Sequence, residues 1–256
     1  MKVYCKTDGQ KVNQVEVFRV KVLITGGTGS LGSELVRHFS NNKNISIIFT
    51  YYNNIEKAYE LSKKYEAKAI CLKDSFDIDT DFDIIINNAG IVNSLEYFEN
   101  VDLEKWNETL EINLTLPFKI IKMNLPHMKK NNFGRIINIS SIYGLRAEEG
   151  LTPYSVSKHG LIGLTKAVAN EYGAYGITCN AICPGVLNSA LADRLADYYT
   201  NTREERIQYF KAITDSVPNK CLVETHEVAE LVYTIAFGNM PNLNGAIITL
   251  DGGDMV

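Results

Sequence analysis

Short apolar runs bounded by turn residues recur along this chain, and each is rich in Ile and Val. They are VKVLITGG (20–27), ISIIFTYY (45–52), AKAICL (67–72), DIIINNAG (83–90), GRIINISS (134–141), GITCNAICPG (176–185) and GAIITLDGG (245–253). Helical stretches lie between most of them, at 31–41, 54–65, 104–130, 154–173 and 226–237. Strands that alternate with helices predict an α/β fold in which helices cover both faces of a parallel sheet. Because no linker or low-complexity segment divides residues 1–256, we expect a single domain.

The charge balance favours a small-molecule partner. The formal net charge is −4, the pI is near 5.7, and no long basic run is present. We therefore expect no nucleic acid and no membrane surface as partner. No segment approaches the ~18 apolar residues of a membrane span, and no continuous apolar stretch follows Lys2 as in a secretory leader.

The cysteines give no sign of a disulfide framework or a zinc site. They are odd in number, scattered and without a CxxC pair: Cys5, Cys71, Cys179, Cys183 and Cys221. This pattern is typical of reduced thiols. We expect a cytoplasmic protein without a bound metal.

A glycine-rich loop follows the first apolar run. TGGTGSLGSELVRHF places Gly27, Gly29 and Gly32 in a GxGxxG pattern between a strand and a helix. Such a loop brings backbone close to a pyrophosphate at a helix N-terminus, so it predicts a Rossmann-type, doubly wound sheet that binds a dinucleotide. FTYYNN (49–54) lacks the acid that would hold the ribose hydroxyls of NAD, which favours NADP, and the nearby cation is Lys57. NAD stays open as the alternative.

A tyrosine and a lysine stand four residues apart in TPYSVSKHG (152–160). On a helix, Tyr154 and Lys158 would point into the same volume. Ser141 ends a predicted strand, NNAG (87–90) ends the preceding one, and Asn113 lies in the helical stretch between them. Open parallel sheets bind their ligands at these strand ends, so the spacing indicates chemistry.

With these motifs the chain resembles the short-chain dehydrogenase/reductase family. The resemblance is to the single-domain branch, which includes 3-oxoacyl-carrier-protein reductases and 3-hydroxybutyrate dehydrogenases, and it covers roughly residues 19–256. It rests on the glycine loop, NNAG, NLTLPF (113–118), GRIINISS, YSVSK, NAICPG (180–185) and DGG (251–253). It implies an NAD(P)-dependent oxidoreductase that is a homodimer or homotetramer, packed partly through the helices at 104–130 and 154–173.

The resemblance also assigns roles to single residues. Tyr154 matches the proton donor, Ser141 the hydroxyl that orients substrate, and Lys158 the lysine that binds the ribose. Asn113 matches an asparagine that holds a water in a proton relay, although it could instead bond only to backbone. Ser189 matches a hydroxyl that contacts the nicotinamide carboxamide, although it could instead cap the following helix.

The implied cofactor-binding set is larger than the catalytic one. It combines the glycine loop, the end of the second strand, an acid beside the adenine, NNAG, the YSVSK pair and the turn after NAICPG: Gly26, Gly27, Thr28, Gly29, Leu31, Gly32, Tyr51, Asp74, Asn87, Ala89, Gly90, Tyr154, Lys158, Pro184, Gly185 and Ser189.

The tyrosine needs a lowered pKa to act as a base near neutrality, since its ordinary pKa is about 10. An ammonium roughly 4 Å away, at an effective dielectric near 20, lowers that pKa by up to about three units before desolvation acts against it. We therefore expect Lys158 to lower the pKa of Tyr154.

The glycine loop departs from the pattern of the resembled branch. That branch has TGxxxGxG, and Ser30 stands here in place of its middle glycine. The spacing resembles the extended branch of the same superfamily, which leaves a nucleotide-sugar-modifying dehydrogenase or epimerase as an alternative. Those chains carry a sizeable extra substrate domain, for which we expect no room here. A non-catalytic, dinucleotide-sensing regulator is the alternative outside enzymes.

Two further segments are unusual for the resemblance. KDSFDIDTDF (73–82) is too short for a helix between the third and fourth strands, so we expect one sheet face to lack its usual cover there. Residues 2–18 contain Asp8 and Gly9 between partly alternating segments, a hairpin signal, and we expect them to pack on this face. A frayed extension is the alternative.

The sequence says least about which residues contact the substrate. Tyr143 and Arg146 lie between Ser141 and Tyr154, and we expect them near the substrate. Residues 187–220 are the expected lid, and its mixture of cations, acids and tyrosines suits a polar substrate or a solvated helix.

Overall fold

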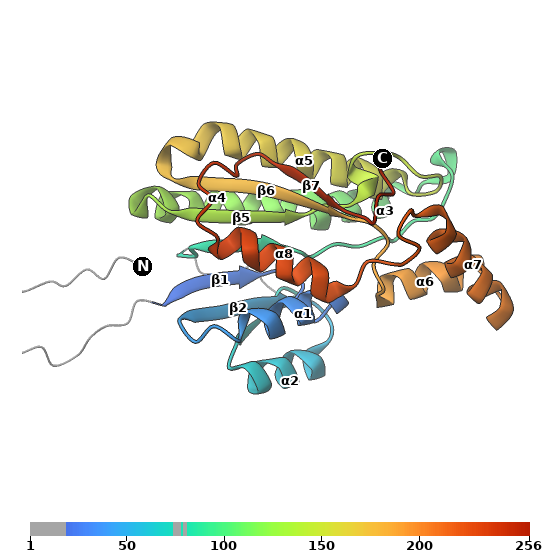
Figure 1. Cartoon of the computed structure of the whole chain (residues 1–256), viewed down its shortest axis with the longest axis horizontal. Coiled ribbons are helices and arrows are strands. Elements are labelled where there is room, and N and C mark those ends of the chain that lie inside the picture. Colours follow the sequence, from blue (N-terminus) through green and yellow to red (C-terminus); the bar gives the residue numbers. More distant parts are fainter. Residues whose placement is uncertain (1–18, 74–77, 79–80) are drawn as a thin grey trace, which may run out of the picture.

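The computed structural model describes residues 19–73, 78 and 81–256 (Figure 1). They form a seven-stranded parallel sheet in the order β3-β2-β1-β4-β5-β6-β7. The strands are β1 (Val20–Ile24), β2 (Ile45–Tyr51), β3 (Lys68–Cys71), β4 (Ile84–Asn87), β5 (Gly134–Ile139), β6 (Ile177–Pro184) and β7 (Ile247–Leu250). Each apolar run contains one strand, and the Rossmann-type, doubly wound sheet is confirmed. The hairpin expected over residues 2–18 and Asp74 lie outside the described residues.

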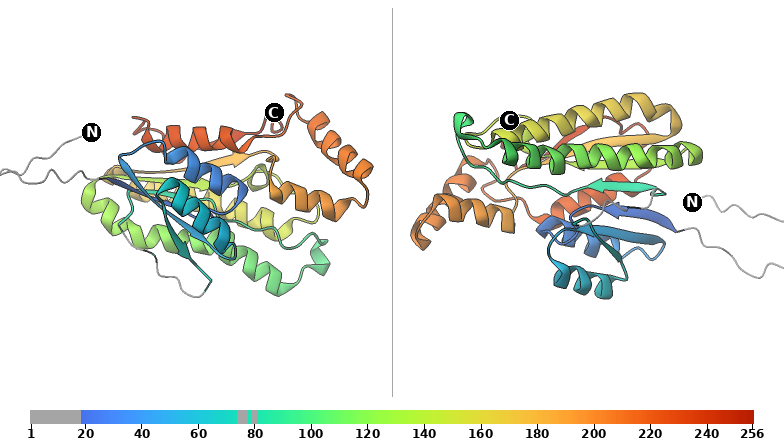
Figure 2. Two further views of the ribbon diagram at one scale, coloured as in Figure 1. Left: turned by 90° about the horizontal axis from the view of Figure 1, so that it is seen from below. Right: turned by 180° about the vertical axis from the view of Figure 1, so that it is seen from behind.

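Helices cover both faces of the sheet (Figures 1 and 2). One face carries α1 (Ser30–Phe39), α2 (Ile55–Tyr65) and α8 (Thr225–Phe237). The other carries α3 (Leu103–Leu110), α4 (Leu116–Asn131) and α5 (Thr152–Tyr172), and α3 continues into α4 through a π-helical turn at Glu111–Thr115. The helical stretch predicted over 104–130 is therefore interrupted at its centre, at Asn113.

The alternation of side chains along the strands separates two cores. In β1, Val22 and Ile24 face α1 and α8, whereas Leu23 faces α4 and α5. All three are fully buried. Because a buried Val, Leu or Ile contributes roughly 1.5–3 kcal/mol, the central strands β1 and β4 fix the position of the loops that leave them.

The short connection between β3 and β4 supplies its own apolar cover. None of its described residues is helical, as expected. The expectation of an uncovered face is only partly right, because Ile78 and Phe82 are buried in the core that contains Leu23 and Ile85. Two apolar side chains of this connection thus take part of the place of a helix, while Ile70, which packs against the same core, stays half-buried.

Two helices stand at the carboxyl edge of the sheet, where the lid was expected. They are α6 (Ala190–Tyr199) and α7 (Arg203–Ser216), and they project from the body of the molecule (Figure 1). Thr202 and Glu205 form a capping box at the start of α7, and the Ser189 hydroxyl caps α6. The segment expected to form the lid therefore contains two helices with side-chain N-caps.

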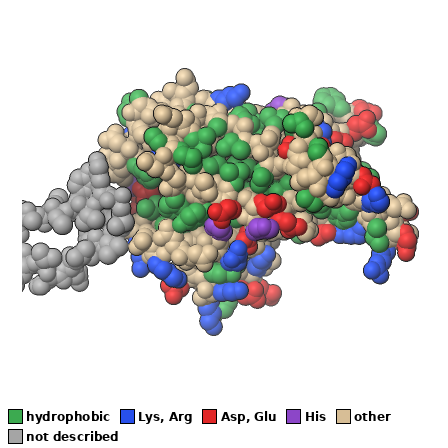
Figure 3. Space-filling model, viewed as in Figure 1, with side chains coloured by type: hydrophobic (Ala, Val, Ile, Leu, Met, Phe, Trp, Pro, Cys, Tyr) green, Lys and Arg blue, Asp and Glu red, His purple; other side chains and the backbone are tan. Residues whose placement is uncertain are grey.

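No helix in the described part of the chain is long and apolar enough to cross a membrane. Its cysteines are free, and within it no group of three or more His, Cys, Asp or Glu could hold a metal ion. Positive and negative side chains are interspersed on the face shown in Figure 3.

Candidate active site

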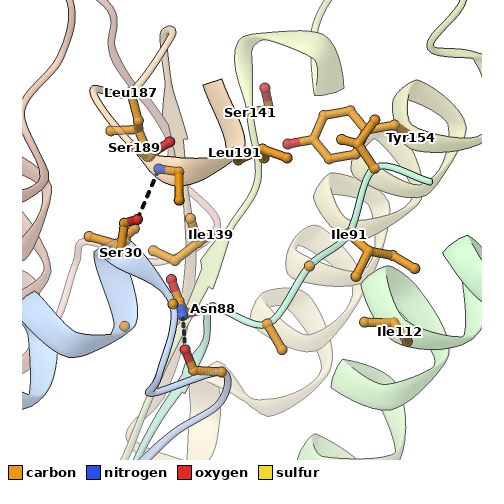
Figure 4. A pocket seen from close by; sticks show the side chains of 18 of the residues that line it. Ser30, Asn88, Ile91, Ile112, Ile139, Ser141, Tyr154, Leu187, Ser189 and Leu191 are labelled. Carbon is orange, nitrogen blue, oxygen red and sulfur yellow. Dashed lines mark hydrogen bonds between the residues drawn. The ribbon is translucent and has the colours of Figure 1, made fainter. Parts of the chain in front are cut away.

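A cavity of about 1040 Å³ lies along the carboxyl ends of the strands. Its walls come from the glycine loop, the loop after β4, the end of β5, the start of α5, and α6 with the turn before it (Figure 4). This is the edge at which parallel sheets bind their ligands. Most of the predicted site residues meet here, although they are spread from Gly26 to Ser189 in the sequence.

The glycine loop is packed so closely that Gly26 and Gly32 leave no space for a side chain. A Cβ on Gly32 would lie 2.1 Å from the Gly26 carbonyl oxygen, and Gly26 itself has φ of +67°. The first turn of α1 is not capped by a side chain, so its N–H groups are available at the cavity. Gly26, Thr28, Gly29, Leu31 and Gly32 line the cavity, whereas Gly27 does not.

Gly27 packs against the sheet. A Cβ there would lie 2.4 Å from the ring of Phe49, and its N–H donates to the Thr50 carbonyl oxygen at 2.7 Å. The motif predicts that Gly27 contacts the cofactor, but Gly27 is not among the residues that line the cavity. Its position instead allows the loop to lie close to β2.

The loop after β4 is tied to the glycine loop through Thr25. The N–H groups of Asn88 and Ala89 both donate to the Thr25 hydroxyl oxygen at 2.9 Å. Asn88, Ala89 and Gly90 line the cavity, but Asn87 does not. The Asn87 side chain is buried in the sheet, where its amide donates to Asn138 at 2.8 Å. Thr25 and Asn88 are therefore site-forming residues that the sequence reasoning missed.

Tyr154, Lys158 and Ser141 come together at the substrate end of the cavity. Figure 4 shows the Tyr154 hydroxyl directed toward Ser141. The Lys158 ammonium lies 5.5 Å from the centre of the Tyr154 ring and donates to the Ile139 carbonyl oxygen at 2.8 Å. The spacing of four residues on α5 thus places both groups on the cavity face, as predicted.

Burial, and not the ammonium, determines the pKa of the tyrosine. Desolvation raises the pKa of Tyr154 to about 12, and its hydrogen bond with Ser141 offsets only part of that effect. Desolvation also lowers the pKa of Lys158 to about 8. The expected lowering of the tyrosine pKa is therefore wrong for this structure, in which Tyr154 is protonated at neutral pH.

Asn113 lies in the π-helical turn, fully buried, and its side chain joins three segments. Its amide donates to the Ile91 carbonyl oxygen and to the Ser157 hydroxyl, both at 3.0 Å. Its side-chain oxygen accepts from the Ile91 N–H at 2.8 Å. Ser157 in turn donates to the Tyr154 carbonyl oxygen at 2.7 Å, so Asn113 is connected to the backbone of the tyrosine.

The turn after β6 leads from the cavity wall into the lid. Pro184, Gly185 and Ser189 line the cavity, and the Ser189 hydroxyl accepts from the Ala192 N–H at 3.4 Å as the cap of α6. The capping role considered for Ser189 is thus present in a residue that also faces the cavity.

The two expected substrate residues lie differently. Tyr143 lines the cavity, and burial raises its pKa to about 12. Arg146 is not among the lining residues. Its guanidinium donates to Asp254 at 2.9 Å, and this ion pair with the C-terminal segment holds it outside the cavity.

The far end of the cavity contains a cation that the sequence reasoning did not single out. Tyr51 lines this end together with Tyr52, Asn53, Asn54 and Lys73. Lys57, the cation expected there, is not among the lining residues. Lys73 follows β3, and the pairing of β3 with β2 brings it to the same cavity wall as Tyr51.

Comparison with known proteins agrees with the geometry. A family model described as short chain dehydrogenase matches residues 20–199. The D-beta-hydroxybutyrate dehydrogenase of Rhizobium meliloti (strain 1021) is 36% identical over 174 residues, 67% of each chain. The acetoacetyl-CoA reductase of the same strain is 32% identical over 243 residues, 90% of this chain and 96% of the relative.

A solved structure shares both the fold and part of the sequence. The actinorhodin polyketide ketoreductase, in a crystal structure of a variant with NADPH, superimposes with a TM-score of 0.83 at 26% identity. The match covers 93% of this chain and 98% of that one.

Proposed function

The chain belongs to the short-chain dehydrogenase/reductase family, and we propose that, as an NAD(P)-dependent oxidoreductase, it transfers a hydride between nicotinamide and a ketone or secondary alcohol with Tyr154 as proton donor. The observation that carries the proposal is the meeting of Tyr154, Ser141 and Lys158 at one end of a cavity whose other end is formed by the glycine loop.

The residues present fit a dinucleotide. The tight packing at Gly26 and Gly32 keeps side chains out of the loop, and the uncapped first turn of α1 suits a pyrophosphate. Lys158 would hold the nicotinamide ribose, and Ser189 the carboxamide. The nicotinamide, when bound, supplies or accepts the hydride.

The chain's own groups handle the carbonyl oxygen and its proton. Ser141 and Tyr154 would each donate a hydrogen bond to the ketone oxygen. As hydride reaches the carbon and the oxygen becomes an alkoxide, Tyr154 gives it the phenolic proton, and the product is the alcohol. A tyrosine that is protonated at neutral pH suits this direction.

Asn113 would act mainly by positioning. All of its side-chain hydrogen bonds go to Ile91 and Ser157, so a water relay at this residue would have to use its backbone carbonyl. Its side chain would hold the loop after β4 and α5 at a fixed distance.

We infer a preference for NADP from the far end of the cavity. Lys73 and Tyr51 both line the cavity after paired strands, where a ribose 2′-phosphate would lie, and no acid from these two strand ends lines it among the described residues. An ammonium favours a phosphate, whereas NAD recognition normally uses a carboxylate. NADP-type recognition would then come from β3 and not from the loop after β2.

Two further proposals follow from the resemblance. The protein would be a homodimer or homotetramer, and it would work in the cytoplasm, where its free cysteines would stay reduced. Residues 1–256 would act as one catalytic domain.

The departure at Ser30 has a structural reason within this chain. Its hydroxyl oxygen accepts a hydrogen bond from the N–H of Ala190 at the start of α6. The serine at this position is therefore explained without the epimerase-type function that the GxGxxG spacing suggested.

Oxidation of NADPH and NADH in the presence of 3-oxo acids, their esters and cyclic ketones tests the proposal. We expect turnover of at least one ketone that depends on Tyr154. Tight dinucleotide binding without oxidation by any ketone or of any alcohol would favour the regulator instead.

A further inference from the structure

The lid contains cations that the hydride transfer does not explain: Arg194, Arg203, Arg206 and Lys211. The structure separates them by their surroundings. Arg206 makes ion pairs with Asp193 and Asp197 and so joins α7 to α6. Lys211 pairs with an acid one turn further along α7. Of the four, Arg194 alone lines the cavity.

Arg194 is exposed, and helical periodicity places it beside two leucines of the cavity wall. Leu191, Arg194 and Leu195 occupy positions i, i+3 and i+4 of α6 and all line the cavity. Asp193 and Asp197 lie on a different side of the helix, where they bind α7. Figure 4 shows Leu191 between Ser189 and Tyr154, so this face of α6 turns toward the reacting groups.

The other cations that line the cavity each have a bonding partner or a proposed role. Lys119 is paired with Glu111, Lys158 is bonded to Ile139, and Lys73 lies at the adenosine end. The acid Glu108 accepts from Asn93. Within the described residues Arg194 has no ion pair, so its charge is not matched by the chain itself.

The cavity wall to which Arg194 belongs contains several leucines. Leu151, Leu187 and Leu195 line the cavity with it. An exposed guanidinium without an ion pair can form charge-assisted hydrogen bonds to an anion that enters the cavity. Arg194 is one helical turn from Leu191, which lies between Ser189 and Tyr154 in Figure 4.

We propose that Arg194 binds a carboxylate carried by the substrate, so that the substrate class is a short oxo acid and not a neutral ketone. The inference rests on the proposed function, since Tyr154 defines where the carbonyl lies. The lid then has a second role, because α6 covers the site and also selects the charge of the substrate.

Kinetics on matched substrates test the proposal. The probes are acetoacetate and 3-oxohexanoate, their methyl esters, and acetoacetyl-CoA, with wild type, Arg194→Gln and Arg194→Lys. We expect Arg194→Gln to raise KM for the acids by about 10- to 100-fold, the range for a lost charge-assisted hydrogen bond, and to leave KM for the esters unchanged. Arg194→Lys recovers part of the loss. Arg203→Gln removes a lid charge outside the cavity and is the control.

Each other pattern overturns the assignment. An equal rise in KM for acids and esters would make Arg194 a packing residue. A rise confined to acetoacetyl-CoA would assign the anion to the phosphates of the thioester. A weaker NADPH affinity by calorimetry would assign Arg194 to the cofactor.

A binding measurement separates this proposal from the proposed function. The complex with NADPH cannot react with an alcohol, so titration of that complex with 3-hydroxybutyrate and with its methyl ester reports binding alone. We expect binding of the acid that Arg194→Gln weakens, whether or not turnover is found. If wild type binds acid and ester equally, or neither, the proposal is wrong even where the enzyme reduces neutral ketones.

Discussion

The hydroxyl oxygen of Ser30 accepts a hydrogen bond from the backbone N–H of Ala190 at 3.1 Å, across 160 residues of sequence (Figure 4). The bond joins the first turn of α1, where a pyrophosphate would lie, to the first turn of the lid helix α6. Having accepted one hydrogen bond, the Ser30 hydroxyl keeps its own proton for a phosphate oxygen. Dinucleotide binding and lid position are therefore physically connected at this residue.

Replacing Ser30 by Ala should loosen that connection. Loss of one hydrogen bond of about 1 kcal/mol corresponds to roughly a fivefold change, so we expect NADPH affinity to fall several-fold. Amide exchange over residues 187–200 should become faster. Ser33→Ala is the control, because the Ser33 hydroxyl bonds only within its own helix, to Gly29 and Ser30. Unchanged exchange in Ser30→Ala would show that the lid is held without this bond.

Replacing Tyr154 by Phe should remove the proton donor and little else. We expect turnover to fall at least ~10²-fold, as for deletion of a positioned acid. NADPH affinity by calorimetry and the melting temperature should stay near wild type, since the ring remains. A variant that keeps more than half of wild-type turnover would contradict the mechanism.

The elements were predictable because their signals are local. Each strand is a short apolar run, and each loop at the carboxyl edge follows such a run, so the sequence places Ser141 and Gly90 on one edge. It was harder to predict which residue at the end of a strand faces the cavity. Asn87 is the last residue of β4, and its side chain donates to Asn138 on the neighbouring strand, so the chain leaves the sheet only at Asn88.

Other features required the folded chain. Arg146 meets Asp254 across 108 residues, and Lys73 shares a cavity wall with Tyr51 because β3 pairs with β2. The pKa of Tyr154 depends on burial, which motif spacing does not report. Such pairings between distant segments set the chemistry of the site, whereas periodicity determines only the elements that carry it.

The lowered pKa of Lys158 predicts a pH-dependent stability. Its folded-state pKa is about 8, below the ordinary 10.5, so between these values the unfolded chain binds more protons. The contribution of Lys158 to stability should therefore rise with pH from about 8 to about 10, so wild type should gain stability relative to Lys158→Met over this range. Near pH 7 the variant should melt at a higher temperature, because it removes a buried charge, yet it should bind dinucleotide more weakly. Thermal unfolding of both proteins without cofactor, across pH 7 to 10, checks the prediction, and equal slopes would contradict it.

The cofactor preference should change at the adenosine end. Lys73→Gln removes the ammonium and should weaken NADPH binding more than NADH binding. Tyr51→Asp supplies the missing acid and should swing preference toward NAD by disfavouring the 2′-phosphate. Lys57→Gln is the control, since Lys57 is outside the cavity wall. Calorimetry with both cofactors gives the ratios, and a wild type that already favours NADH tenfold would reject the NADP assignment.

The outer face of α5 should bury itself against a second copy of the chain. Its exposed positions include Val156 and Gly163, small or apolar residues that are unusual on a solvated helix, and Phe118 is exposed on the neighbouring α4. We expect sedimentation to give a dimer or tetramer at micromolar concentration.

A Cβ on Gly163 would meet nothing within 4 Å in the isolated chain, so Gly163→Arg is compatible with the fold of one subunit and obstructs only a partner. That variant should sediment as a smaller species with an unchanged circular dichroism spectrum. Gly163→Ala, which adds one methyl group, should keep the wild-type assembly. A monomeric wild type, or a Gly163→Arg variant that assembles normally, would show that this face is not the interface.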